Sequence, residues 1–150
     1  MIRNILVATD GSKVAAKAVR FAAGLAKQLK AGITVVGVVD ITSLFAPALI
    51  VPPVTHSRMI METQDALKAA TGQQVDAAAA VCSRMGLKPK KAVRSGRPSE
   101  EIVKEARKSK ADLIIVGSHG RSAFKAVVLG SVAYGVIHGS TTIPVLTVRK

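Results

Sequence analysis

The sequence predicts an α/β fold, an open sheet of five parallel strands with helices on both faces. Short apolar runs alternate along the chain with longer segments of helical period, and a glycine ends three of the helical segments. The runs at 33–39 and 113–116 are apolar on both faces, as strands buried inside a parallel sheet are. This alternation implies right-handed crossovers between parallel strands. At 150 residues, we expect one domain over 1–150.

The first strand is expected at 2–8, followed by a turn at Asp10-Gly11-Ser12. Either Asp10 or Ser12 has a side chain that can cap the helix that comes next. We expect that helix to end at Gly32, because glycine is common at helix ends. Apolar residues recur on one side of it at helical spacing: Ala15, Ala18, Val19, Ala22, Leu25, Ala26 and Leu29.

A second buried strand is expected at 33–39. The stretch 41–57 contains three prolines and has no regular period, so it is interpreted as a long connection. It is unusually apolar for a loop, and it either packs against the surface of its own domain or forms a lid or a partner surface. Residues 58–86 can form one long helix, in which Gly72 weakens the middle and Gly86 is the expected stop.

The second half of the chain completes the alternation. A third strand is expected at 87–94, and the alternation of Lys91 with Val93 favours an exposed position in the sheet. Pro98 and the glutamates after it suit the first turn of a helix. The run at 113–116 is the fourth strand, a helix follows over about 130–138, and 143–148 forms the last strand.

The charge is strongly positive, with a formal net charge of +13. Such a protein attracts polyanions by long-range electrostatics. Nucleic-acid binders often place aromatic residues among the basic ones for base stacking, and none lies in the most basic stretch. We therefore expect a solvated basic face rather than specific nucleic-acid binding. The stretch contains Lys88, Lys90, Lys91, Arg94, Arg97, Lys104, Arg107, Lys108 and Lys110.

Several features favour the cytoplasm. Arg3 is followed by a strand pattern rather than by a long apolar stretch with a cleavage site, so we expect no signal peptide. No run approaches 18 uninterrupted apolar residues, the length that a membrane-spanning helix needs. Cys82 is the single cysteine and lies on an apolar helical stripe, where we expect a packed thiol in a reducing environment.

A glycine motif follows the fourth strand. Gly117, Gly120, Gly130 and Ser131 have the spacing G-x2-G-x9-G-S. Glycine lets a ligand approach the backbone closely, and a Gly-Ser pair that opens a helix offers N–H groups, a hydroxyl and the positive end of the helix dipole. The motif therefore suits a cradle for phosphate oxygens. A plain strand–turn–helix connection explains the glycines equally well.

The same stretch, GSHGRSAFKAVVLGS, resembles the nucleotide-binding segment of the universal stress protein family, in its ATP-binding branch. The opening ILVATDGS at 5–12 and the closing TIPVLTV at 142–148 are also similar to that family, and 41–57 is the least similar part. The resemblance implies the strand order 3-2-1-4-5, ATP as ligand and a homodimer joined through the last strands, at 143–148. In this order the first and fourth strands meet at a switch point, where ligands bind in open α/β sheets.

Asp10 is the strongest single candidate in this crevice. Its carboxylate can accept a hydrogen bond from a ribose hydroxyl or hold Mg²⁺ beside the phosphates, or simply cap the helix. The resemblance implies a nucleotide contact at this position. It also implies contacts to the base or ribose from Ala8 and Val38, for which core packing is the alternative, while Asp40 is expected to cap a turn.

The remaining candidates surround the glycine motif. The resemblance implies backbone contacts to the nucleotide at Val116 and Gly117 and a phosphate cradle at the other motif positions. His119 and Arg121 can add positive charge there, although a surface loop explains both. The complete set of candidate site residues is Ala8, Thr9, Asp10, Val38, Val116, Gly117, Ser118, His119, Gly120, Arg121, Gly130, Ser131 and Val132.

The expected function is that of an ATP-binding sensor or switch in a stress response. The sequence has no G-x4-G-K-[ST] loop, no Ser-Gly-Gly run after the first strand and no evident catalytic base, so we expect ATP hydrolysis to be slow at most. The alternatives are a nucleotide-free interaction protein, a basic nucleic-acid-binding protein and a slow ATP hydrolase.

Overall fold

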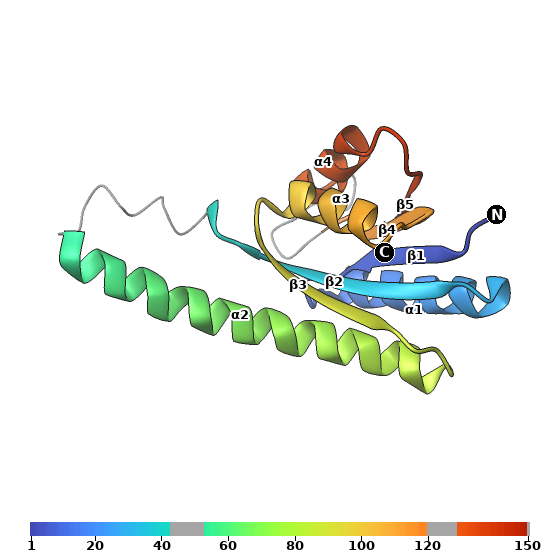
Figure 1. Cartoon of the computed structure of the whole chain (residues 1–150), viewed down its shortest axis with the longest axis horizontal. Helices are drawn as coiled ribbons and strands as arrows, with labels where there is room; N and C mark the ends of the chain where they lie inside the picture. Colours follow the sequence, from blue (N-terminus) through green and yellow to red (C-terminus); the bar gives the residue numbers. More distant parts are fainter. Residues whose placement is uncertain (43–52, 120–128, 150) are drawn as a thin grey trace.

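A computed structural model describes residues 1–42, 53–119 and 129–149 (Figure 1). Its centre is a five-stranded sheet in the order β3-β2-β1-β4-β5, and every neighbouring pair is parallel. The fold class and strand order expected from the sequence are therefore confirmed. The strands are β1 (Asn4–Ala8), β2 (Gly32–Asp40), β3 (Lys90–Gly96), β4 (Leu113–Gly117) and β5 (Val145–Val148).

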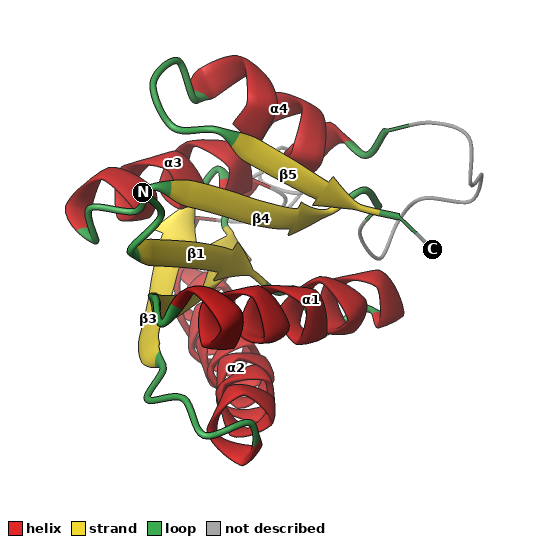
Figure 2. Cartoon of the chain, turned by 90° about the vertical axis from the view of Figure 1, so that its right-hand side faces the viewer, coloured by secondary structure: helices red, strands yellow, loops and turns green. Residues whose placement is uncertain are grey.

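Four helices cover the two faces of the sheet (Figure 2). They are α1 (Lys13–Leu29), α2 (Pro53–Arg84), α3 (Pro98–Lys108) and α4 (Ser131–Gly139). α1 and α2 pack on one face, and α3 and α4 pack on the other. The central strands are buried from both sides, because Ile5 and Val7 face the α1–α2 core while Leu6 faces the α3–α4 core. This explains why the β1 run is apolar at consecutive positions.

The end of α1 differs from the prediction. The helix ends at Leu29, and Lys30 takes the left-handed C-cap conformation with φ of 53°. Gly32, expected to be the stop, is instead the first residue of β2, where its N–H donates to Arg3 O at 2.8 Å. The prediction was wrong because it assumed glycine at the cap. A lysine adopts this conformation here at a local cost of about 1 kcal/mol.

The connection predicted at 41–57 is shorter than expected, because α2 already begins at Pro53. Proline lacks only an N–H that is unused in the first turn of a helix, so it starts this helix rather than extending the loop. The rest of the connection, 43–52, lies outside the described residues. α2 continues through Gly72 to Arg84, and Gly86 follows with φ of 85°, which confirms it as the stop.

The outer strands are displaced from their predicted positions. β3 runs over Lys90–Gly96 rather than 87–94, and β5 begins at Val145 rather than at 143. β3 lies at one edge of the sheet, as the strand order implied by the family resemblance required, and β5 lies at the other. Strand ends are hard to place from sequence where the flanking residues are neither glycine nor continuously apolar. Within the described residues, no helix is long and apolar enough to span a membrane.

Candidate functional site

The carboxyl ends of β1 and β4 lie side by side at the centre of the sheet. Val7 is paired with Ile115, so the residues that follow each strand, from Ala8 and from Val116, leave the sheet next to each other. Asp10 follows one of these strands and Gly117 ends the other. The topology thus brings together the two segments that the sequence indicated, at the point where the strand order reverses.

The turn after β1 is held by its own side chains. Asp10 Oδ1 accepts a hydrogen bond from Ser12 N at 2.9 Å, and Thr9 Oγ1 accepts one from Gly11 N at 3.2 Å. Ser12 is the N-cap of α1, since its Oγ accepts from Ala15 N at 3.1 Å. Of the two capping candidates, Ser12 therefore caps the helix. Asp10 shapes the turn before it and is half-buried.

The backbone of Ser118 joins three elements. Its N–H donates to Val148 O at 2.8 Å, and its carbonyl accepts from Gly130 N at 2.7 Å. The end of β4, the end of β5 and the start of α4 are therefore fixed to one another. Gly117-Ser118 and Gly130-Ser131, the two halves of the glycine motif, lie together as a result. Sequence reasoning did not foresee this link, because nothing in the residue types distinguishes Ser118 as its centre.

The N-terminus of α4 faces this junction without a capping side chain. Gly130 is the N-cap, with φ of −63° and ψ of 151°, and it makes no side-chain hydrogen bond to the helix. The side chains of Ser131 and Val132 are exposed. A helix start of this kind presents N–H groups and the positive end of a dipole to an anion.

Gly117 has a packing role that the sequence did not reveal. A Cβ atom at this position would lie 3.0 Å from Val14 Cγ1 and 3.3 Å from Ala15 N, both in the first turn of α1. The absent side chain therefore makes room for α1. The ligand-approach interpretation of this glycine is a separate hypothesis, and a substitution here disturbs packing whether or not a ligand binds.

His119 has one ring nitrogen without a partner among the described residues. Its Nδ1 lies 2.7 Å from Ser118 Oγ, and its Nε2 is buried with no hydrogen bond to this part of the chain. An unsatisfied buried polar atom is costly and is usually explained by water, an ion or a ligand. Gly120 and Arg121, the next two candidates, lie outside the described residues.

The three apolar candidates on the strands pack in the α3–α4 core. Val116 is buried there, while Ala8 and Val38 are half-buried against it. Core packing thus accounts for all three, and the partial exposure of Ala8 and Val38 leaves them accessible at the strand ends. Asp40 Oδ1 accepts from Thr42 N at 2.9 Å, the turn-capping role that the sequence indicated. The described residues contain no group of three or more His, Cys, Asp or Glu side chains that could hold a metal ion.

This fold, an open parallel sheet with a switch point between β1 and β4, defines a doubly wound α/β protein. The chain belongs to the universal stress protein family, whose family model matches residues 1–149. A curated relative, universal stress protein MJ0531 of Methanocaldococcus jannaschii, is 32% identical over 150 residues, which cover 100% of this chain and 84% of the relative.

Solved structures show the same fold. The structure of hypothetical protein MJ0577, from the same organism, matches with a TM-score of 0.85 and 30% identity, covering 100% of this chain and 97% of the other. A universal stress protein in complex with cAMP matches at 0.67 and 24% identity over 99% and 97% of the two chains. One from Archaeoglobus fulgidus in complex with dAMP matches at 0.64 and 22% identity over 99% and 100%.

Proposed function

We propose that the chain acts as one ATP-binding domain, over 1–150, and serves as a nucleotide-dependent sensor or switch in a stress response. The observation that carries the proposal is the junction at Ser118, which holds the glycine motif together in front of the uncapped start of α4. Membership in the universal stress protein family supports it. So do the two family structures in complex with the adenine nucleotides cAMP and dAMP.

In the proposed complex the phosphates lie at the start of α4, near the N–H groups of Ser131 and Val132 and the Ser131 hydroxyl. His119 Nε2 is buried without a hydrogen-bond partner among the described residues, and it would bond a phosphate oxygen. By the family resemblance, Gly120 and Arg121 complete this cradle, together with the backbone of Gly117 and Ser118.

The nucleoside half is proposed to lie over the ends of β1 and β2. Ala8, Thr9 and Val38 would contact the base or ribose there, and Asp10 would accept a ribose hydroxyl. Asp10 is also the proposed protein ligand of Mg²⁺. A single carboxylate is enough for Mg²⁺, since this ion keeps several waters and takes its other ligands from substrate phosphates.

The switch would work by linkage. ATP bound across the crevice would stabilise the Ser118 junction, and any partner that distinguishes the bound from the free form would respond to the nucleotide. Hydrolysis is expected to be slow at most. We propose that the protein acts as this switch in the cytoplasm, where the buried thiol of Cys82 stays reduced.

A melting experiment tests ATP binding. Mg-ATP at about 100 times its Kd should stabilise the wild type by about 2.7 kcal/mol, which raises Tm by roughly 5–10 °C. Asp10→Asn keeps an oxygen that accepts from Ser12 N, so the turn survives while the negative charge is lost. We expect at least half of the Tm increase to disappear in this variant. Asp65→Asn, at an exposed position on α2, is the matched control and should keep it.

Before these melts, any nucleotide carried through purification is removed, and the protein is shown to be free of bound nucleotide. If nucleotide-free wild-type protein then shows no change in Tm with millimolar Mg-ATP, the proposed function is wrong. If Asp10→Asn and Asp65→Asn lose the Mg-ATP-dependent increase in Tm to the same extent, Asp10 has no specific role in the site. ATP binding itself would still stand.

A homodimer through β5 is the proposed assembly. β5 is an edge strand, and its Leu146 and Val148 are half-buried apolar side chains that an exposed edge would leave open to association. Sedimentation equilibrium at tens of micromolar protein should give twice the chain mass of 15.6 kDa. A mass of one chain under these conditions would contradict the dimer.

A further inference from the structure

Basic side chains are concentrated at the end of the molecule opposite the candidate site. The strands start there, and three of the helix-to-strand turns, α1–β2, α2–β3 and α3–β4, lie at this end. Hydrogen bonds join two of these turns to the start of β1: Gly32 N donates to Arg3 O at 2.8 Å, and Asn4 Nδ2 donates to Lys110 O at 3.2 Å. We call this surface the basic end. It consists of nine exposed residues: Arg3, Lys27, Lys30, Arg84, Lys88, Lys90, Arg107, Lys108 and Lys110.

These charges are not neutralised within the described part of the chain. All five ion pairs found there use other cations, namely Arg58, Lys91, Arg94, Arg97 and Lys104. One acid, Asp112, lies beside these residues in the chain, and its Oδ2 accepts from Arg3 N at 2.8 Å and Asn4 N at 2.9 Å. These hydrogen bonds lower the pKa of Asp112, so it adds one fixed negative charge against nine positive ones.

The helix dipole explains only part of this surface. Lys27, Arg84, Arg107 and Lys108 lie in last helical turns, where a cation offsets the negative end of a helix. The other five lie outside the helices. Two of them, Lys30 and Lys110, have φ of 53°, a conformation in which glycine is the usual residue. Lysine thus occupies two positions where the backbone favours glycine, which indicates that charge matters there.

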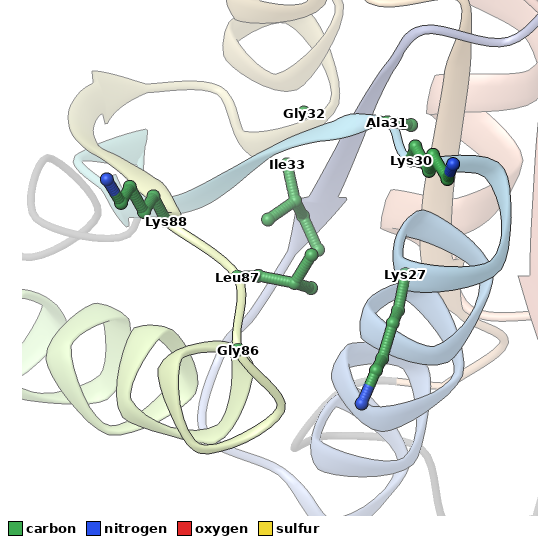
Figure 3. A pocket seen from close by; sticks show the side chains of 8 residues that line it. All are labelled: Lys27, Lys30, Ala31, Gly32, Ile33, Gly86, Leu87 and Lys88. Carbon is green, nitrogen blue, oxygen red and sulfur yellow. The ribbon is translucent and has the colours of Figure 1, made fainter.

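A hollow lies within this surface (Figure 3). It has a volume of about 400 Å³ and lies between the end of α1 and the turn from α2 to β3. The side chains of Ile33 and Leu87 point toward each other, and Lys27 and Lys30 lie on one side of them with Lys88 on the other. No acidic residue lines it.

We propose that the basic end binds the phosphate backbone of double-stranded nucleic acid, independently of base sequence. Lysines lie on both sides of a hollow, and this concave arrangement fits a phosphate backbone better than it fits the flat surface of a bilayer. The described aromatic residues, Phe21 and Tyr134, lie on α1 and α4 and outside the basic end, so base stacking has no side chain to use there. Charge alone then carries the affinity. This proposal does not rest on nucleotide binding at the opposite end.

The test uses Lys30→Gly combined with Lys110→Gly. Glycine suits φ of 53°, so the double variant loses two charges without added backbone strain, and its Tm should not fall. Binding is measured by fluorescence anisotropy with a labelled DNA duplex of mixed sequence. Each phosphate contact gives a salt slope of about −0.9, or roughly eightfold in affinity at 0.1 M salt, so two contacts give about 60-fold. The slope itself should become about 2 units less steep.

Lys17→Ala combined with Lys68→Ala is the matched control. Both lysines are exposed on helices away from the basic end, and alanine preserves the helices. This control should retain nearly all of the affinity for the duplex. Saturating Mg-ATP should leave duplex binding unchanged, because the two sites lie at opposite ends.

Three outcomes would overturn the proposal. Equal weakening in both double variants would mean that net charge, not this surface, attracts the duplex. Displacement of the duplex by Mg-ATP would place it in the crevice. Tight binding to vesicles of anionic lipid, together with no binding to the duplex, would make the partner a membrane surface.

Discussion

Gly37→Val should lower the Tm of the protein by about 10 °C. Gly37 lies in β2 beneath α2, and a Cβ at this position would be 2.7 Å from Cγ2 of both Thr71 and Val75. Thr71 and Val75 are buried, so neither has open space to move into. Overpacking of this kind costs about 3 kcal/mol, and for a chain of this length each kcal/mol lowers Tm by roughly 3 °C.

Gly72→Ala, one residue from Thr71 on α2, is the matched comparison. A Cβ at Gly72 would meet nothing within 4 Å, so the substitution adds no clash. Alanine is about 0.5–1 kcal/mol more favourable than glycine inside a helix, and Tm should therefore rise by about 2 °C. If Gly37→Val melts at the wild-type temperature by circular dichroism, α2 is not packed on β2 as described.

The predicted helical stripe of α2 shows why part of the fold could be inferred from sequence. Ala78, Val81 and Cys82 repeat at helical spacing, and they lie in the half of the helix that packs on the sheet. In the other half, from 61 to 70, the side chains are exposed or half-buried and no burial enforces a pattern. Hydrophobic period is therefore informative only where a helix has a partner.

The central strands were predictable for the same reason. β1 and β4 are covered on both faces, so burial requires apolar residues at consecutive positions such as Ile114 and Ile115. Element ends were less predictable, because they depend on local competition. Lys30 is the C-cap of α1, where glycine is more common, and Pro53 begins α2 inside the predicted loop. The hydrophobic periodicity of the sequence indicates neither feature.

The position of the candidate site followed from topology, but its internal contacts did not. Parallel strands align their carboxyl ends at one edge, so Asp10 and Gly117 had to meet once the strand order was known. The order itself came from family resemblance. The bonds of Ser118 to Val148 and Gly130 depend on the exact paths of three chain segments, which residue types do not specify.

The two halves of the glycine motif should respond differently to substitution. Gly117→Val would place side-chain atoms against Val14 and the backbone of Ala15, and this should cost about 2–3 kcal/mol in the absence of any ligand. We therefore expect its Tm without nucleotide to be about 5–10 °C below the wild-type value. A loss of ATP response in this variant would not by itself identify a ligand contact.

Ser131→Pro separates ligand contact from packing. Proline is favoured in the first position of a helix, and Gly130, with ψ of 151°, already has the extended conformation that a residue before proline needs. Tm without nucleotide should stay within about 2 °C of wild type, since little packing changes. The variant lacks the N–H and the hydroxyl at 131, so the increase in Tm with Mg-ATP should be lost.

Gly117→Val and Ser131→Pro together distinguish a ligand contact from a packing role, which neither variant does alone. A stable Ser131→Pro protein that no longer responds to Mg-ATP would place the phosphates at the start of α4, because its fold and its Asp10 turn are unchanged. A full response in this variant would move the phosphates away from α4. The glycine motif would then be explained by packing, with Gly117 making room for α1 and Gly130 bonding to Ser118.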